Sequence, residues 1–384
     1  MDSHFGLSFT HGQGIWLYDE NGRAYLDATS GMAQCSLGYA HPDVTGTLQK
    51  QAALLLHGAT HHHCLEQERL AQRLARMTPL QHAFFCHSGA EANEIAIKFA
   101  RLFGHKKGID TPSIMVMNGA FHGSTLATLS ASSSRKMHAG HEPLVTGFVR
   151  APYNDMDALR TIAHHRDDVV AVMLELIQSE AGVVSANSAY LRAVATLCAE
   201  RDWLFMVDEV QTANGRTGSL LASQAMDVVP DSLTMAKGLA NGVPIGVCLL
   251  GERVVDRIKP AQQDAAWGGN ALACATALTV LDVIERDALC EHAFAMGSRL
   301  KEQCMDAFGD QAHVKSIRGR GLLLGIELDR PAWDCRRLGL FHQIILDVTA
   351  EKVIRLMPPL IIQAHEIDAL VLRLKQTLDA FVGA

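Results

Sequence analysis

The sequence predicts an α/β protein with two domains: a large domain built on a mainly parallel sheet flanked by helices, and a smaller α+β domain. Through the middle of the chain, short apolar runs alternate with amphipathic helical segments, as in βαβ units. After about residue 285 the order of elements changes, and 384 residues are enough for more than one core. We expect the large domain over residues 50–285 and the small domain from both chain ends, 1–49 and 286–384.

The N-terminal residues predict a hairpin followed by two helices. Alternating residues at 15–18 and 24–26 flank a polar turn at 19–22. Helical spacing of apolar residues follows over 44–57 and 64–77.

The central and C-terminal elements follow from the same periodicities. In the centre we expect strands at 82–86, 113–118, 169–175, 203–207 and 245–250, and helices at 90–103, 190–201 and 269–286. The smaller domain should then contain a helix at 292–308, a strand at 321–328 and a helix at 366–381, with the N-terminal hairpin completing it.

The composition excludes several classes of protein. The formal net charge is −7, from 34 basic and 41 acidic side chains, which disfavours nucleic-acid binding. No apolar run reaches the roughly 18 residues of a membrane span. The first residues, MDSHFGLSF, contain neither the basic nor the long apolar region of a signal peptide. The nine cysteines are scattered singly without a CxxC pair, so we expect a reducing, cytoplasmic location and no disulfides.

A carboxylate and a lysine are the strongest chemical signal. Asp208 follows the apolar run LFMV, and the carboxyl end of a parallel strand faces the crevice where α/β proteins bind ligands. Lys237 lies among small residues in the segment TMAKGLANG. Pyridoxal phosphate catalysis needs such a pair: a lysine that bonds the cofactor's aldehyde, and a buried aspartate that keeps the pyridine nitrogen protonated. The alternative is a solvated lysine and a structural acidic residue at a strand end.

Two further segments follow predicted strands. Ser88, Gly89 and Ala90 open a helix, whose N-terminal N–H groups can bind an anion such as a phosphate. Ser88 can equally be an ordinary helix cap that forms a capping box with Glu91, and both interpretations can hold together. Phe121 could stack on a planar ring or pack in the core.

Taken together, these motifs resemble class III pyridoxal-phosphate aminotransferases of fold type I, over nearly the whole chain. The resemblance rests on Asp208-Glu209-Val210-Gln211, Gly215-Arg216-Thr217-Gly218, Ala236-Lys237-Gly238, Gly268-Gly269-Asn270, Ser88-Gly89-Ala90-Glu91-Ala92-Asn93-Glu94 and Phe121-His122-Gly123. Three more segments are most similar to acetylornithine aminotransferases: Leu37-Gly38-Tyr39-Ala40-His41-Pro42, Asn241-Gly242-Val243-Pro244-Ile245-Gly246 and Val353-Ile354-Arg355-Leu356-Met357-Pro358-Pro359-Leu360.

The resemblance implies a role in cofactor binding for most of the residues singled out. Lys237 would bond pyridoxal 5′-phosphate and carry a proton, and Asp208 would pair with the pyridine nitrogen. Gln211 would hydrogen-bond the phenolic oxygen, while Val210 and Phe121 would sandwich the ring. The remaining cofactor-binding residues would be Gly89 and Ala90, through backbone N–H groups to the phosphate, with Ser88 and His122.

The resemblance also implies the substrates and the assembly. Arg355 would bind the α-carboxylate of 2-oxoglutarate or glutamate with two parallel hydrogen bonds. Glu180 would neutralise an arginine when the amine donor is bound. Members of the family are dimers with shared active sites, so we expect a homodimer.

Three positions depart from the family pattern. Ser124 stands where acetylornithine enzymes usually carry an arginine, and Ala265 and Ala266 stand where the family usually has serine and threonine. Because one charged clamp is missing, we expect an ornithine-like or other ω-amine donor that is less acidic at its far end than acetylornithine.

Alternatives remain at this point: a pyridoxal-phosphate racemase or epimerase of an amino compound, and a non-catalytic relative that retains the fold. Arg355 argues against the first, and the intact Asp208, Gln211 and Lys237 argue against the second. We expect no metal site at 61–64, because consecutive side chains diverge. The histidines at 164–165 should lie in a solvated loop, and Arg318-Gly319-Arg320-Gly321 in a turn.

Overall fold

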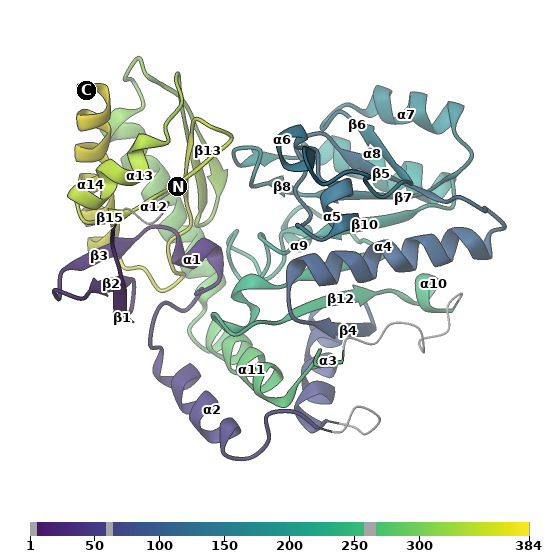
Figure 1. The fold of residues 1–384 in the computed structure, drawn as a ribbon, viewed down its shortest axis with the longest axis horizontal. Helices are drawn as coiled ribbons and strands as arrows, with labels where there is room; N and C mark the ends of the chain where they lie inside the picture. The colour runs from purple at the N-terminus through teal and green to yellow at the C-terminus, as the bar shows by residue number, and fades with distance from the viewer. Residues whose placement is uncertain (1–5, 59–63, 257–265, 384) are drawn as a thin grey trace.

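The computed structural model describes residues 6–58, 64–256 and 266–383 and confirms the predicted α/β class (Figure 1). A seven-stranded sheet forms its centre, in the order β4-β12-β11-β10-β7-β5-β6. All neighbouring pairs in this sheet are parallel except those of β12. The strands are β4 (His82–Cys86), β5 (Ser113–Met117), β6 (Phe148–Ala151), β7 (Val169–Glu175), β10 (Leu204–Asp208), β11 (Ser232–Met235) and β12 (Gly246–Leu250).

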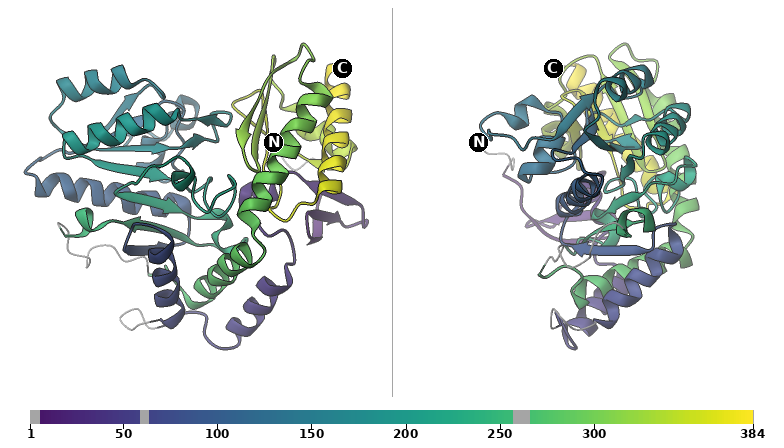
Figure 2. Two further views of the ribbon diagram at one scale, coloured as in Figure 1. Left: turned by 180° about the vertical axis from the view of Figure 1, so that it is seen from behind. Right: turned by 90° about the vertical axis from the view of Figure 1, so that its right-hand side faces the viewer.

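Helices cover both faces of this sheet because its strands are apolar on both sides. One face packs in a single cluster with α4 (Gly89–Lys106) and α5 (Leu126–Ala131). The opposite face packs against two pairs of helices: α7 (Met156–His165) with α8 (Ser188–Glu200), and α3 (Leu65–Met77) with α11 (Ala271–Arg286). Figure 2 shows the resulting layers from behind and from the side. The remaining short elements here are α6 (Arg135–His138), β8 (Ile177–Gln178), β9 (Val184–Ser185), α9 (Ala222–Ala225), the 3-10 helix η1 (Lys237–Ala240) and α10 (Glu252–Val255).

Segments from both chain ends form the rest of the molecule, on the left in Figure 1. One four-stranded sheet joins β1 (Phe9–Gln13), β2 (Trp16–Asp19), β3 (Ala24–Asp27) and β15 (Ile344–Ile345), and a second has the order β13-β14-β17-β16. The strands of the second sheet are β13 (Val314–Arg320), β14 (Leu323–Leu328), β17 (Val353–Leu356) and β16 (Asp347–Thr349). The helices are α1 (Ser30–Ala33), α2 (Pro42–Ala52), α12 (Leu289–Phe308), α13 (Asp334–Phe341) and α14 (Ala364–Val382).

The two parts share α11, which contributes to both cores. Its residues Ala273 and Ala277 pack with α3 against the large sheet, whereas Val280 and Ile284 belong to the core of the second part. The domain boundaries near residues 50 and 285 therefore stay a prediction, since this helix continues from one core into the other.

Three expectations about local structure are wrong. The helix expected to continue to residue 57 ends at Ala52, because Leu54, Leu55 and Leu56 are exposed and do not extend a buried face. His164 and His165 end helix α7 instead of lying in a loop. The segment 318–320 belongs to strand β13, where Arg318 and Gly319 pair with β14, and the turn begins only at Gly321.

The described residues also show the state of the cysteines and the character of the helices. All nine cysteines are free thiols. Within 6–58, 64–256 and 266–383, no helix combines the length and apolar composition that crossing a membrane would require.

Candidate active site

The carboxyl ends of three neighbouring strands carry the polar residues of the site. Asp208 is the last residue of β10, and it lies directly opposite Thr234 of β11 and Glu175 of β7 in the parallel ladders. Lys237 follows β11 and begins η1 with a left-handed φ of 45°, a conformation that costs a lysine free energy and is common at functional sites. The large sheet therefore presents Asp208, Glu175 and Lys237 at one edge.

A cavity of about 420 Å³ lies at this edge, within the size range of small-molecule sites. Most of the residues singled out in the sequence line it: Ser88, Gly89, Ala90, Phe121, His122, Ser124, Glu180, Asp208, Val210, Gln211 and Lys237. Arg355 and Ala266 are not among the described lining residues.

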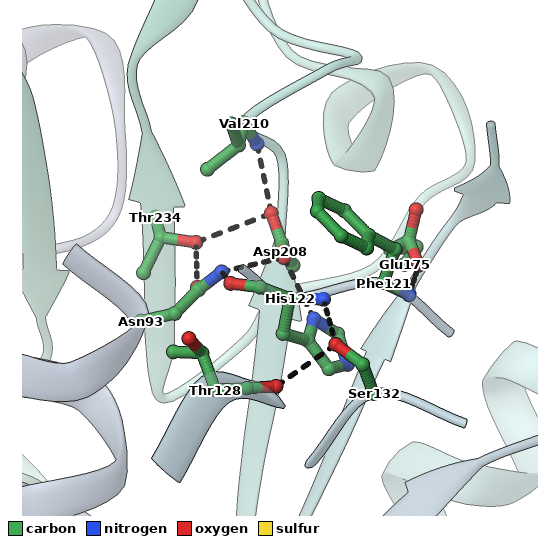
Figure 3. A network of polar contacts seen from close by, with 9 residues as sticks. All are labelled: Asn93, Phe121, His122, Thr128, Ser132, Glu175, Asp208, Val210 and Thr234. Atoms are coloured by element: carbon green, nitrogen blue, oxygen red, sulfur yellow. Dashed lines mark hydrogen bonds and ion pairs between the residues drawn. The ribbon is translucent and has the colours of Figure 1, made fainter. Parts of the chain in front are cut away.

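The Asp208 carboxylate lies at the centre of a buried hydrogen-bond network (Figure 3). Its Oδ2 accepts from Asn93 Nδ2 and pairs with His122 Nδ1, each at 2.7 Å. Its Oδ1 accepts from the Val210 N–H at 3.0 Å and from Thr234 Oγ1 at 3.5 Å. These donors stabilise the ionised carboxylate in a place where burial alone would disfavour a charge.

The imidazole of His122 is a hydrogen-bond partner of the Asp208 carboxylate. Burial would lower the pKa of its imidazole, but the hydrogen bond to Asp208 and that carboxylate's charge together raise the pKa above its ordinary value. Ser132 Oγ accepts from the His122 N–H at 2.9 Å and fixes the backbone. The imidazole therefore orients Asp208 and compensates part of its charge.

Lys237 is enclosed by the cavity walls. Burial, and then the nearby charge of Arg355, lower the pKa of its amine to about 8. Lys237 Nζ donates to Gln211 Oε1, while Gln211 Nε2 contacts Met357 Sδ at 2.7 Å. A lysine with a lowered pKa is more often neutral, and only the neutral amine is a nucleophile or a base.

The start of helix α4 forms another wall. Ser88 caps the helix, with its Oγ accepting from the Glu91 N–H at 3.2 Å. The expected capping box is modified, because the Glu91 carboxylate accepts from the His87 N–H at 2.6 Å. The first N–H groups of a helix have no partner within it, so those of Gly89 and Ala90 are suited to an anion.

In the view of Figure 3, Phe121 lies to the right of the Asp208 carboxylate and Val210 lies above it. The Phe121 N–H donates to Glu175 Oε1 at 2.9 Å, so the neighbouring strand end holds this residue in place. Burial raises the pKa of the Glu175 carboxyl, which favours its neutral form.

Arg355 lies behind the cavity wall, paired with two carboxylates. Its Nη1 donates to Glu180 Oε1 at 2.6 Å and to Ser179 Oγ at 2.9 Å. Its Nη2 lies 2.7 Å from Asp347 Oδ2. Burial would lower the pKa of the guanidinium, but Glu180 and Asp347 raise it, so Arg355 stays charged.

The three positions that depart from the family pattern lie in different places. Ser124 is exposed and lines the cavity. Ala266 is exposed on a turn away from the cavity of its own chain, beside Trp267, and Ala265 lies outside the described residues. Residues 61–63 of the histidine run also lie outside them, and no group of three or more potential metal ligands occurs in the rest.

The residues present fit pyridoxal phosphate. The cavity contains an amine, Lys237, and a carboxylate, Asp208, that accepts hydrogen bonds from several donors. At the N-terminus of α4, Gly89 has no side chain, and Gly123 allows a close approach of its loop to Ala90, because a Cβ on Gly123 would lie 2.7 Å from Ala90 Cβ. An aldehyde, a pyridine nitrogen and a phosphate thus each have a matching partner in one cavity.

We expect Gly89→Ala to weaken cofactor binding at least about tenfold, which is more than 1.4 kcal/mol. A Cβ at this position would lie 2.5 Å from Val210 Cγ1, and Val210 is a β-branched side chain that cannot easily turn away. Titration of the cofactor-free protein, followed by absorbance, measures the change. Gly46→Ala is the control, because Gly46 lies in α2 with open space around it. The control should bind normally and gain up to about 1 kcal/mol of folding stability. If both variants bound the cofactor with equal affinity, the proposed contact between the cofactor phosphate and the Gly89 N–H would be contradicted.

Several residues of the site were not assigned roles from the sequence. Glu175 ends a buried apolar run as Asp208 does, so the same strand-end rule could have found it. Asn93 lies one turn into α4 and hydrogen-bonds both Asp208 and Thr234. No local signal marks Asp347, because its contact with Arg355 depends on the pairing of β16 with β17.

Comparison with known proteins gives consistent results. The family model Aminotransferase class-III matches residues 2–378. The chain is 44% identical over 376 residues to the acetylornithine aminotransferase of Nitrosomonas europaea, covering 98% of this chain and 96% of the relative.

Similar solved structures cover the chain equally well. The ornithine aminotransferase of Toxoplasma gondii ME49 has a TM-score of 0.94 and 31% identity, covering 98% of this chain and 92% of that one. The acetylornithine aminotransferase of Elizabethkingia anophelis has a TM-score of 0.86 and 29% identity, covering 97% and 94%.

Proposed function

Since the chain belongs to the class-III aminotransferase family and is an aminotransferase, we propose that its cavity binds pyridoxal phosphate and transfers an amino group from an ornithine-like or other ω-amine donor to 2-oxoglutarate. The observation that carries the proposal is the placement of Lys237 and Asp208 in one cavity at the N-terminus of α4. When bound, pyridoxal phosphate supplies an electron sink for the bonds of the substrate's amine-bearing carbon.

The residues of the chain supply binding, orientation and proton transfer. Lys237 would hold the cofactor and, once the substrate amine has displaced it, accept the proton from the amine-bearing carbon. A pKa of about 8 leaves a useful fraction of this amine neutral near neutral pH. Asp208, held in place by its donors, would face the pyridine nitrogen and keep it protonated.

Arg355 and Glu180 would adapt the site to its two substrates. In this structure Glu180 pairs with Arg355 and neutralises the buried cation. An amine substrate that has no carboxylate near Arg355 can then bind. When 2-oxoglutarate enters, its carboxylate would take the place of the Glu180 carboxylate on Nη1. The exchange of one carboxylate for another keeps Arg355 paired in both halves of the reaction.

The enzyme is proposed to be a homodimer with shared active sites. Leu54 is 68% and Trp267 is 65% exposed, and Trp267 stacks on His57 at the end of the Leu54–Leu56 segment, with ring centroids 5.2 Å apart. A second copy would cover these apolar side chains. Ala266, next to Trp267, would then lie nearer the partner's cofactor than its own.

A reducing compartment such as the cytoplasm would suit the nine free thiols.

We expect the enzyme to prefer ω-amines that are less acidic at their far end over acetylornithine, because Ser124 offers no charge at the cavity mouth. Glutamate formation from 2-oxoglutarate across a panel of donors measures this. Ser124→Arg should raise kcat/KM for acetylornithine by about 10- to 100-fold, the value of a charge-assisted hydrogen bond. Ser124→Gln, similar in reach but uncharged, should not. A strong preference of the unmodified enzyme for acetylornithine would refute the role of Ser124.

The same assay tests the dependence on a keto-acid acceptor, which distinguishes an aminotransferase from the racemase or epimerase considered from the sequence. A racemase or epimerase turns over without a keto-acid acceptor, whereas an aminotransferase stops after one half-reaction when 2-oxoglutarate is omitted. The paired guanidinium of Arg355 beside the cavity favours the dependence on an acceptor.

A further inference from the structure

Strand β16 places a carboxylate directly beside Arg355. Asp347 and Arg355 are opposite each other in the antiparallel ladder between β16 and β17. Asp347 Oδ2 accepts from Arg355 Nε at 2.9 Å and lies 2.7 Å from Nη2. A single carboxylate oxygen therefore binds both Nε and Nη2, the two nitrogens on one edge of the guanidinium.

The two carboxylates on Arg355 differ in where they come from. Glu180 lies in the turn after β8, lines the cavity, and has a side chain that is 34% exposed. Asp347 belongs to a paired strand, is not among the described lining residues, and has a side chain that is 15% exposed. Glu180 thus contacts Arg355 from the cavity side, and Asp347 contacts it from the sheet.

We propose that Asp347 is a positioning residue, which fixes the Nε–Nη2 edge of Arg355 while Glu180 is exchanged for a substrate carboxylate. This inference rests on the proposed function of Arg355 in binding the keto acid. Arg355 is 1% exposed, and a buried cation without any counter-ion is strongly unfavourable. Asp347 provides a counter-ion that stays in place, so Glu180 can leave without stranding the charge.

The geometry also restricts how a substrate carboxylate binds. With its Nε–Nη2 edge occupied, the guanidinium can offer an incoming carboxylate only its Nη1 and Nη2 end. Glu180 and Ser179 now occupy Nη1. Asp347 thereby determines the orientation of the keto acid relative to Lys237, and selects acceptors whose carboxylate can approach that end.

Two substitutions of Asp347 test the proposal through the two half-reactions. Asp347→Ala removes the anchor, so KM for 2-oxoglutarate should rise by about 10- to 100-fold, the loss of a hydrogen bond to a charged group. Asp347→Asn keeps an acceptor oxygen and should recover most of this loss. The half-reaction with an alkyl monoamine, which has no carboxylate for Arg355, should be unchanged in both variants. A merely structural defect would impair both half-reactions alike.

Two further variants make the outcome decisive. Asp368→Ala removes an exposed carboxylate that pairs with Arg299 and should change neither half-reaction. Arg355→Ala tests the function on which the inference rests: an unchanged KM for 2-oxoglutarate would overturn both. If Arg355→Ala raises this KM and Asp347→Ala does not, only the role of Asp347 is overturned. Equal losses with the monoamine and with 2-oxoglutarate in Asp347→Ala would also overturn it.

Discussion

Replacing Lys237 with alanine should abolish turnover, by at least about 10⁴-fold, and should remove the visible absorbance of the bound cofactor. Lys237 supplies the one amine among the described residues that line the cavity. It would serve both as the attachment point of the cofactor and as the group that moves the proton, and general acid–base catalysis alone contributes about 10²- to 10⁴-fold. Steady-state rates and the absorbance spectrum of the purified variant measure the two effects.

Two control variants separate chemistry from charge and folding. Lys237→Arg keeps a positive charge in the cavity but has no nucleophilic amine, so it should be as inactive as Lys237→Ala. Lys98→Ala removes an exposed lysine from helix α4 and should behave like the unmodified enzyme. Activity of Lys237→Ala near the level of the Lys98→Ala control would refute the assignment.

Asp208→Asn should lower kcat by about 10³-fold with little change in the overall fold. Two opposite charges about 4 Å apart interact by about 4 kcal/mol at an effective dielectric constant of 20, which corresponds to roughly that factor. Both oxygens of Asp208 accept hydrogen bonds. The NH₂ group of an asparagine would therefore face a donor instead of an acceptor. Single-turnover rates with a saturating amine donor measure the loss without interference from product release.

Glu175→Gln is the matched control for Asp208→Asn. Both carboxylates are buried at neighbouring strand ends in the same register. Because burial raises the pKa of Glu175 and favours its neutral form, the glutamine should cost less than about tenfold. If Glu175→Gln is as damaging as Asp208→Asn, the pyridine nitrogen is not paired with Asp208 alone.

The sequence was informative where one local pattern decides the structure. Continuous apolar runs located β7 and most of β10, and the carboxyl-end rule placed Asp208 at the cavity. The helix at 64–77 was predictable because its apolar residues repeat on one buried face.

Other elements could not be predicted because tertiary contacts override local preference. Strand β13 contains Arg318 and Gly319, which signal a turn by composition but are held extended by β14. The short element α1 (Ser30–Ala33) has a positive φ at every residue, a conformation that no composition rule predicts for Met32 and Ala33.

The ion pairs of Arg355 could not be predicted from the sequence either. The resemblance implied that it binds a substrate carboxylate, but its two carboxylate partners come from a neighbouring strand and from a distant turn. Only the assembled fold brings Asp347 and Glu180 to the same guanidinium, and the proposed exchange of carboxylates rests on that arrangement.

The most direct measurement is borohydride reduction of the protein after loading with pyridoxal phosphate, followed by peptide mass analysis. Reduction fixes the cofactor to the amine that holds it. The phosphopyridoxyl mass should appear on the peptide that contains Lys237, and disappear when an amine donor is added before the reduction. A label on any other lysine, or no label on a protein that still transfers amino groups, would contradict the assignment of this cavity as the catalytic site.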